Sequence, residues 1–126
     1  MKVDTGADVL LHKPSKIIKD RRIGLITNQT GVTKKLRPII DLLHEDPRIK
    51  LTALFSPEHG IRGDVQDARS IKSHIDERTG LPVYSLYGET KKPTTDMLSD
   101  VDVLMFDIQD VGARYYTYIY TMAYAM

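Results

Sequence analysis

Residues 101–108 read Val-Asp-Val-Leu-Met-Phe-Asp-Ile, a nearly unbroken apolar run with an acidic residue close to its end. Strands that are buried on both faces of a parallel sheet have this kind of sequence. Three further short apolar runs end in turn-forming residues and are also predicted strands. They cover residues 22–27 (RIGLIT), 49–55 (IKLTALF) and 81–87 (LPVYSLY).

Helical patterns alternate with these strands. Between residues 34 and 45 the apolar side chains recur at i, i+3, i+4 and i+7 and share one helix face, which consists of Leu36, Ile39, Ile40 and Leu43. Asp46-Pro47 closes this helix. A short helix is expected near residues 95–98 and a longer one over 114–126. Strands alternating with helices predict an α/β fold whose sheet is open, with right-handed crossovers.

The composition predicts one globular domain over residues 1–126, with 41% hydrophobic and 28% charged residues. The net charge of +1 gives no long-range field that would attract nucleic acid or an anionic membrane. The absence of cysteine excludes disulfides, thiol catalysis and thiolate metal sites. No apolar run approaches the roughly 20 residues of a membrane span. The last helical pattern ends without a cap, so we expect the N-terminal portion of a longer protein.

Polar side chains follow each predicted strand. They are Asn28, Glu58, His59, Glu89, Asp107, Gln109 and Asp110. The carboxyl ends of parallel strands share one rim, where ligands bind in open α/β sheets. Several carboxylates on one rim can supply general acid and base catalysis. Glu58 is set between Pro57 and His59-Gly60, a rigid setting that suits a positioned catalytic group.

Structural roles compete with these catalytic ones. Asp110 fits the N-cap of the following helix equally well, Asp107 fits an ion pair with Arg114, and Glu89 fits a solvated turn. His59 is a candidate metal ligand, but the other histidines lack zinc-ligand spacing, so no metal or other cofactor is expected.

Two longer stretches carry weaker signals. Residues 28–31 (NQTG) occupy the position of a phosphate-binding turn without its motifs, so a nucleotide-binding module is a weaker alternative. The polar stretch between residues 61 and 80 has no sustained period and is a candidate lid.

Four motifs, taken together and in order, carry a family resemblance. They are residues 23–28 (IGLITN), 54–64 (LFSPEHGIRGD), 79–88 (TGLPVYSLYG) and 106–114 (FDIQDVGAR). The chain resembles a family of bacterial exo-acting β-N-acetylmuramidases, long catalogued as a domain of unknown function. The resemblance implies a glycosidase that removes N-acetylmuramic acid from the non-reducing end of peptidoglycan fragments during cell-wall turnover.

The same resemblance implies an architecture and a catalytic residue. It implies a Rossmann-like, three-layer N-terminal domain with a mostly parallel sheet, truncated here after the helix that follows the fourth strand. A smaller C-terminal domain would be absent. It also identifies Glu58 as the catalytic glutamate of the family.

Glycoside hydrolysis usually needs one carboxylic acid for the leaving oxygen and a second carboxylate to activate water or attack the sugar. Glu58 is the predicted acid, Asp107 or Asp110 is the predicted second group, and assistance by the substrate's acetamido group stays an alternative. Arg62 or Arg114 is the candidate partner of the lactyl carboxylate of muramic acid. The remaining predicted saccharide-binding residues are Asn28, His59, Glu89, Gln109 and Tyr115.

The expected partner is a peptidoglycan-derived saccharide, with neither nucleic acid nor a membrane span. The apolar face of the last helix is expected to promote self-association. The expected location is the bacterial cell envelope or the exterior if an upstream signal was removed, with the cytoplasm as the alternative. A non-catalytic carbohydrate-binding module is the competing function.

Overall fold

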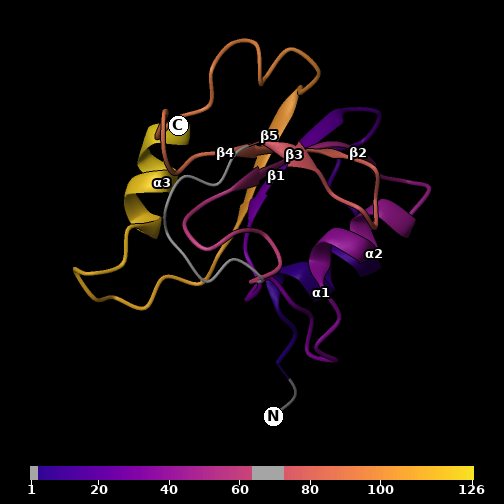
Figure 1. Ribbon diagram of the computed structural model, residues 1–126. Helices are drawn as coiled ribbons and strands as arrows, with labels where there is room; N and C mark the ends of the chain where they lie inside the picture. Colours follow the sequence, from indigo (N-terminus) through magenta and orange to yellow (C-terminus); the bar gives the residue numbers. More distant parts are fainter. Residues whose placement is uncertain (1–2, 64–72) are drawn as a thin grey trace.

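A computed structural model of the chain describes residues 3–63 and 73–126. Five strands form one sheet in the order β3-β4-β2-β1-β5 (Figure 1). Their bounds are β1 Arg22–Thr27, β2 Lys50–Ser56, β3 His74–Ile75, β4 Pro82–Ser85 and β5 Val103–Asp107. β4, β2, β1 and β5 pair in parallel, and the two-residue β3 pairs antiparallel at one edge. The predicted α/β fold with a mostly parallel sheet is confirmed.

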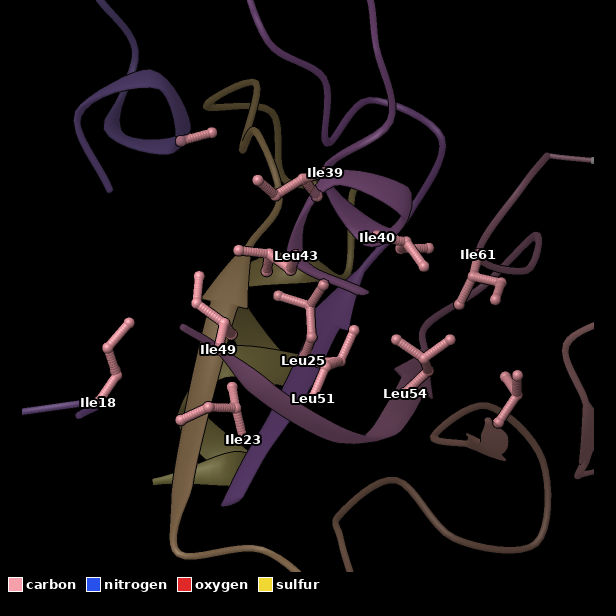
Figure 2. Packing of buried hydrophobic residues seen from close by; sticks show 12 residues of the cluster. Ile18, Ile23, Leu25, Ile39, Ile40, Leu43, Ile49, Leu51, Leu54 and Ile61 are labelled. Carbon is pink, nitrogen blue, oxygen red and sulfur yellow. The ribbon is translucent and has the colours of Figure 1, made fainter. Parts of the chain in front are cut away.

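Helices cover both faces of this sheet. α1 (Gly6–His12) and α2 (Ile39–Glu45) lie on one side, and α3 (Tyr118–Ala125) lies on the other (Figure 1). Figure 2 shows Ile39, Ile40 and Leu43 of α2 turned toward strand residues of the larger core cluster. A smaller cluster of Ile26, Ala53, Phe55 and Leu86 fills the opposite face. Burying each such side chain stabilises the fold by about 2 kcal/mol.

The strand order fixes where a ligand would bind. The chain passes from β1 to β2 and β4 on one side, then returns to add β5 on the other side of β1. This reversal places a topological switch point between the carboxyl ends of β1 and β5, where open α/β sheets bind ligands. Thr27 pairs with Asp107, so both strands end at the same level.

Three predicted helices differ from the structure. α2 begins at Ile39 rather than residue 34, because Leu36 has a positive φ of 58° and Pro38 occupies the N-cap. Leu36 is therefore 79% exposed instead of joining the buried face. α3 begins at Tyr118 rather than residue 114, and residues 95–98 form turns rather than a helix.

Two short elements were not predicted, and one predicted loop lies partly outside the described residues. α1 was not predicted, although a capping box starts it: Asp8 N donates to Thr5 Oγ1 (3.1 Å) and Thr5 N donates to Asp8 Oδ2 (3.1 Å). β3 was also not predicted. The candidate lid between residues 61 and 80 has its central part, residues 64–72, outside the described residues.

Candidate active site

Glu58 lies in the turn that ends β2. The Leu86 amide donates to the Ser56 carbonyl at 2.8 Å, which ties this strand end to the segment after β4. His59 and Gly60 then take positive φ values of 70° and 81°, which reverse the chain directly after Glu58. The Glu58 side chain, 23% exposed, lines a hollow of about 320 Å³. The other lining residues are Gln29, His59, Tyr115, Tyr116, Thr117 and Tyr118.

Polar groups from separate elements contact the Glu58 carboxylate. The Thr117 hydroxyl donates to Glu58 Oε2 at 3.4 Å from the N-terminus of α3. The neighbouring Glu58 carboxylate raises the pKa of Tyr87, which lies just beyond β4. His59 Nε2 lies 3.9 Å from Glu58 Oε1. The carboxylate is thus contacted from its own loop and from the start of α3.

Asp107 lines a second, larger hollow of about 720 Å³ at the switch point between β1 and β5. Its Oδ2 atom is buried and has no hydrogen-bond partner among the described residues. Burial raises the pKa of Asp107, because a charged carboxylate loses its hydration there. No ion pair joins Asp107 to Arg114 within the part of the chain that the structure describes, so the structural role suggested by the sequence is not observed.

The two carboxyl-bearing hollows adjoin, since Gln29, Tyr116 and Tyr118 line both of them. Gln29 also lines a third hollow of about 210 Å³ that contains Asn28 and Arg62. Gln29, the residue after Asn28, therefore lines all three hollows, which adjoin at the carboxyl ends of β1, β2 and β5 and make up the candidate cleft.

Arg62 is bound by carboxylates on two sides. Its Nε and Nη2 donate to Asp76 at 2.7 and 2.8 Å, and Nη2 also donates to Asp41 of α2 at 3.0 Å. The guanidinium lowers the pKa of Asp76 to about 2. Asp41 and Asp76 are both buried, so this cluster fastens the loop that carries Glu58 to α2 and to the turn after β3.

The side-chain amide of Asn28 has hydrogen-bond partners at its oxygen but, among the described residues, none at its nitrogen. Its Oδ1 accepts from the Thr30 amide at 3.0 Å and from the Thr30 hydroxyl at 2.7 Å, while its buried Nδ2 has no partner among the described residues. The turn that contains Asn28 is tight. A Cβ at Gly31 would lie only 2.2 Å from Thr27 Oγ1, so a residue with a side chain would not fit there. Asn28 therefore presents a fixed amide donor beside β1.

The remaining predicted site residues lie further out. Asp110 is exposed, and its carboxylate accepts from the Gly112 amide at 3.1 Å in a local turn, so it does not cap α3. Gln109 lines the Asp107 hollow, and Tyr115 lines the Glu58 hollow. Glu89 and Arg114 are exposed and do not line these two hollows.

Sequence reasoning did not select Tyr87, Thr117, Gln29, Tyr116 or Tyr118. Two of these had a usable signal. Tyr87 is the last residue of a predicted strand, and Gln29 stands next to Asn28 in the turn after another predicted strand. The positions of the other three depend on how the segment before α3 packs, which residue patterns do not specify.

The described residues contain neither a membrane-spanning helix nor a cluster of metal ligands. None of the helices in residues 3–63 and 73–126 is both long and apolar enough to cross a membrane. Across the same residues, no three side chains of His, Asp or Glu gather as a metal site would require.

Comparison with known proteins places this geometry in context. A family model described as exo-β-N-acetylmuramidase NamZ, N-terminal, matches residues 23–126. The chain is 65% identical over 125 residues to a Bacillus subtilis protein named peptidoglycan β-N-acetylmuramidase NamZ. This match covers 99% of the chain and 30% of that relative.

Two crystal structures of DUF1343 family proteins from Bacteroides fragilis share the fold. One has 54% identity and a TM-score of 0.87, covering 98% of this chain and 30% of its own. The other has 36% identity and a TM-score of 0.77, covering 100% and 31%. The chain thus spans about 30% of the length of the relatives that it matches. Its motifs, its sheet and the match over residues 23–126 show that it belongs to the exo-β-N-acetylmuramidase NamZ family, in the N-terminal part.

Proposed function

We propose that the chain carries the catalytic carboxyls of an exo-β-N-acetylmuramidase that releases N-acetylmuramic acid from the non-reducing end of peptidoglycan fragments. One observation carries the proposal. Glu58, which matches the catalytic glutamate of the family, lines a hollow that adjoins the one at the switch point of the sheet, which a second, unpaired carboxyl at Asp107 lines. The name of the Bacillus subtilis relative supports the same reaction and substrate class.

The cleft has the chemistry that a sugar requires. Tyr116 and Tyr118 lie between the two hollows with their ring centroids 5.8 Å apart, and aromatic faces pack well against the apolar faces of pyranose rings. The side-chain amides of Gln29 and Gln109 offer both donors and acceptors for hydroxyl groups.

Recognition of the lactyl carboxylate falls to Arg114 in this proposal. Arg62 was the other candidate, but its guanidinium already binds Asp76 and Asp41. Arg114 makes no ion pair within the described residues and stands one position before Tyr115, which lines the Glu58 hollow. A planar guanidinium can bind a carboxylate through two hydrogen bonds.

The proposed substrate also bears on location. Peptidoglycan fragments arise at the cell envelope, so we place the protein there or outside the cell. Fractionation of the native host into envelope, medium and cytoplasm, followed by immunodetection, tests this placement. Recovery in the cytoplasm alone would contradict it.

The activity is tested by measuring release of N-acetylmuramic acid from the disaccharide MurNAc-GlcNAc, with the wild-type chain and with Glu58→Gln. Loss of a catalytic carboxyl should lower kcat by about 10³-fold. The affinity for the disaccharide, measured by calorimetry, should change little because the amide keeps the shape of the side chain. Glu77→Gln is the matched control, since Glu77 is exposed in the turn after β3 and should retain full turnover.

The competing functions predict other results. A carbohydrate-binding module would bind the disaccharide without releasing either sugar, and Glu58→Gln would then weaken binding. Saturable binding of a nucleotide, with none of the disaccharide, would favour the nucleotide-binding alternative.

A further inference from the structure

A further hollow, of about 270 Å³, lies between α3 and the segment that follows β4, and we call it the α3 hollow. Thr117 lines both this hollow and the Glu58 hollow, so the two adjoin. Tyr87 lines the α3 hollow as well, and the neighbouring Glu58 carboxylate raises its pKa. The polar lining residues are Tyr87, Lys91, Thr117, Tyr120, Thr121 and Tyr124.

The Glu58 hollow therefore has two neighbours, which it meets through different residues. Tyr116 and Tyr118 join it to the hollow at the switch point of the sheet, and Thr117 joins it to the α3 hollow. Removal of a terminal sugar needs room for that sugar and, beyond the scissile bond, room for the rest of the saccharide. The proposed function places the terminal sugar between the two carboxyl-bearing hollows. The α3 hollow is then the neighbour that is left for the rest of the saccharide.

One face of α3 and its N-cap brings hydroxyl groups to this hollow. Thr117, Tyr120, Thr121 and Tyr124 fall at i, i+3, i+4 and i+7, and all four line it. A tyrosine ring offers an apolar face together with a hydroxyl group, and a threonine hydroxyl both donates and accepts hydrogen bonds. Tyr120 and Tyr124 are 55% and 52% exposed, so a ligand can reach their rings. Pyranose rings, which have apolar faces and hydroxyl edges, match this surface.

Lys91 gives the α3 hollow its positive charge. No ion pair within residues 3–63 and 73–126 involves Lys91, and the other lining residues are uncharged. The Thr90 hydroxyl donates to the Lys92 carbonyl at 2.7 Å and accepts from the Lys92 amide at 3.2 Å, so a local turn holds the backbone on both sides of Lys91. An unpaired ammonium group attracts a carboxylate. In a peptidoglycan saccharide, that carboxylate is the lactyl group of each N-acetylmuramic acid.

We propose that the α3 hollow binds the saccharide beyond the scissile bond, with N-acetylglucosamine against Tyr120 and Tyr124 and the lactyl carboxylate of the next N-acetylmuramic acid at Lys91. The proposal rests on the proposed function and adds the direction in which the substrate lies, from the switch point toward α3. It also assigns a preference. A saccharide that continues into a second N-acetylmuramic acid gains the contact with Lys91, which MurNAc-GlcNAc lacks.

The probe is the disaccharide GlcNAc-MurNAc, which corresponds to the saccharide beyond the scissile bond. Its non-reducing sugar is N-acetylglucosamine, so the proposed activity leaves it intact and binding is measured without turnover. Titration into the nitrogen-15-labelled chain should shift the amide resonances of Tyr120, Thr121 and Tyr124. The amide of Ile17, which is exposed and distant in sequence from α3, should stay unmoved. Calorimetry gives the affinity.

The contribution of the aromatic rings is tested at Tyr124. Tyr124→Ala should weaken binding of GlcNAc-MurNAc about fivefold, because the ring face is lost. Tyr124→Phe keeps the ring and should lose less, which separates loss of stacking from a disturbed fold. Ile119→Ala is the matched control, since Ile119 is a similarly exposed residue of α3 that does not line the hollow. Equal losses in Tyr124→Ala and Ile119→Ala would contradict the contact with Tyr124.

The contribution of charge is tested at Lys91. Lys91→Gln should weaken binding of GlcNAc-MurNAc about threefold at low salt, and the difference should vanish in about 0.5 M salt. Binding of GlcNAc-GlcNAc, which has no carboxylate, should not change. Lys92→Gln is the matched control, since Lys92 is the next residue, is exposed and does not line the hollow. Equal affinities of the wild type for the two disaccharides would refute the role of Lys91.

The outcomes separate this proposal from the proposed function. Release of N-acetylmuramic acid from MurNAc-GlcNAc, with α3 resonances that GlcNAc-MurNAc does not shift, refutes the saccharide site and leaves the glycosidase intact. Binding of GlcNAc-MurNAc at α3 without any release from MurNAc-GlcNAc contradicts the proposed function and supports the saccharide site. Resonances of α3 that respond to protein concentration and not to the disaccharide would assign the hollow to a second copy of the chain and overturn the proposal.

Discussion

The ion pairs of Arg62 show how a single side chain stabilises the active-site loop. Asp76 has a pKa of about 2 in the folded protein, below the value near 4 that is usual for unfolded chains. A group with a lowered folded pKa stabilises the protein above its unfolded pKa, and this contribution disappears as the pH falls toward the folded value. Asp76 therefore makes folding stability fall between about pH 5 and pH 2.

Arg62→Ala should lower the free energy of unfolding at pH 7 by about 3 kcal/mol, because it leaves the buried Asp76 carboxylate without its cation, whereas Asp41 keeps its ion pair with Arg78 at 3.1 Å. The pH dependence between pH 5 and pH 2 should become shallower, since the pKa of Asp76 returns toward its ordinary range. Urea denaturation at several pH values measures both effects. Arg37→Ala is the control: its pair with Glu45 is exposed and should contribute about 0.5 kcal/mol or less. A variant with the wild-type pH dependence would contradict this account.

The sequence predicted where some residues of the candidate site lie, and not where others lie, for a physical reason. Glu58 and Asp107 stand at the ends of apolar runs, so the topology alone brings them to one rim. The contact of Thr117 with Glu58 joins residues that are 59 positions apart, and such a contact depends on how α3 packs. Likewise, the charge of Arg62 suggested a substrate contact, whereas packing against α2 paired it with Asp41.

At the scale of elements, the position where α2 begins can be tested by the substitution Leu36→Gly. Its effect on folding stability has opposite signs for a helix that begins at Ile39 and for one that begins at residue 34. Leu36 is exposed with a positive φ, so Leu36→Gly should relieve strain and raise stability by about 1 kcal/mol. A helix beginning at residue 34 would place Leu36 inside it, and the same change would then cost about 1 kcal/mol. Chemical denaturation measures the difference, and Leu43→Ala, at a buried position of α2, should cost about 3 kcal/mol as a positive control.

The strands were more predictable than the helices. Four strands were predicted from short apolar runs, because the strands of a parallel sheet that is covered on both faces are rich in apolar residues. Helical spacing extended α2 backward over Leu36, where the backbone turns at a positive φ before Pro38. α1 has only seven residues, too few for a clear period, and β3 has two.

At the scale of the whole molecule, the outer side of α3 is the apolar surface of interest. Ile119, Tyr120, Met122 and Tyr124 are each between 39% and 55% exposed. Exposed apolar patches favour association, so we expect the chain to self-associate as its concentration rises. Sedimentation velocity from micromolar to millimolar concentrations measures this, and Ile119→Lys with Met122→Lys should keep the chain monomeric. Ile17→Lys is the control, since Ile17 is exposed but distant in sequence from α3. A concentration-independent monomer in the wild type would refute the expectation.

The position of β5 has a consequence for assembly. β1 is paired on both sides, whereas β5 pairs only with β1 among the described strands, so its other margin keeps backbone donors and acceptors unpaired. Such a margin is a template for an incoming strand. The strand ends at Asp107, and any backbone added there would lie directly beside the Asp107 carboxyl. Assembly through an added strand at this edge would therefore affect the acidity of that carboxyl.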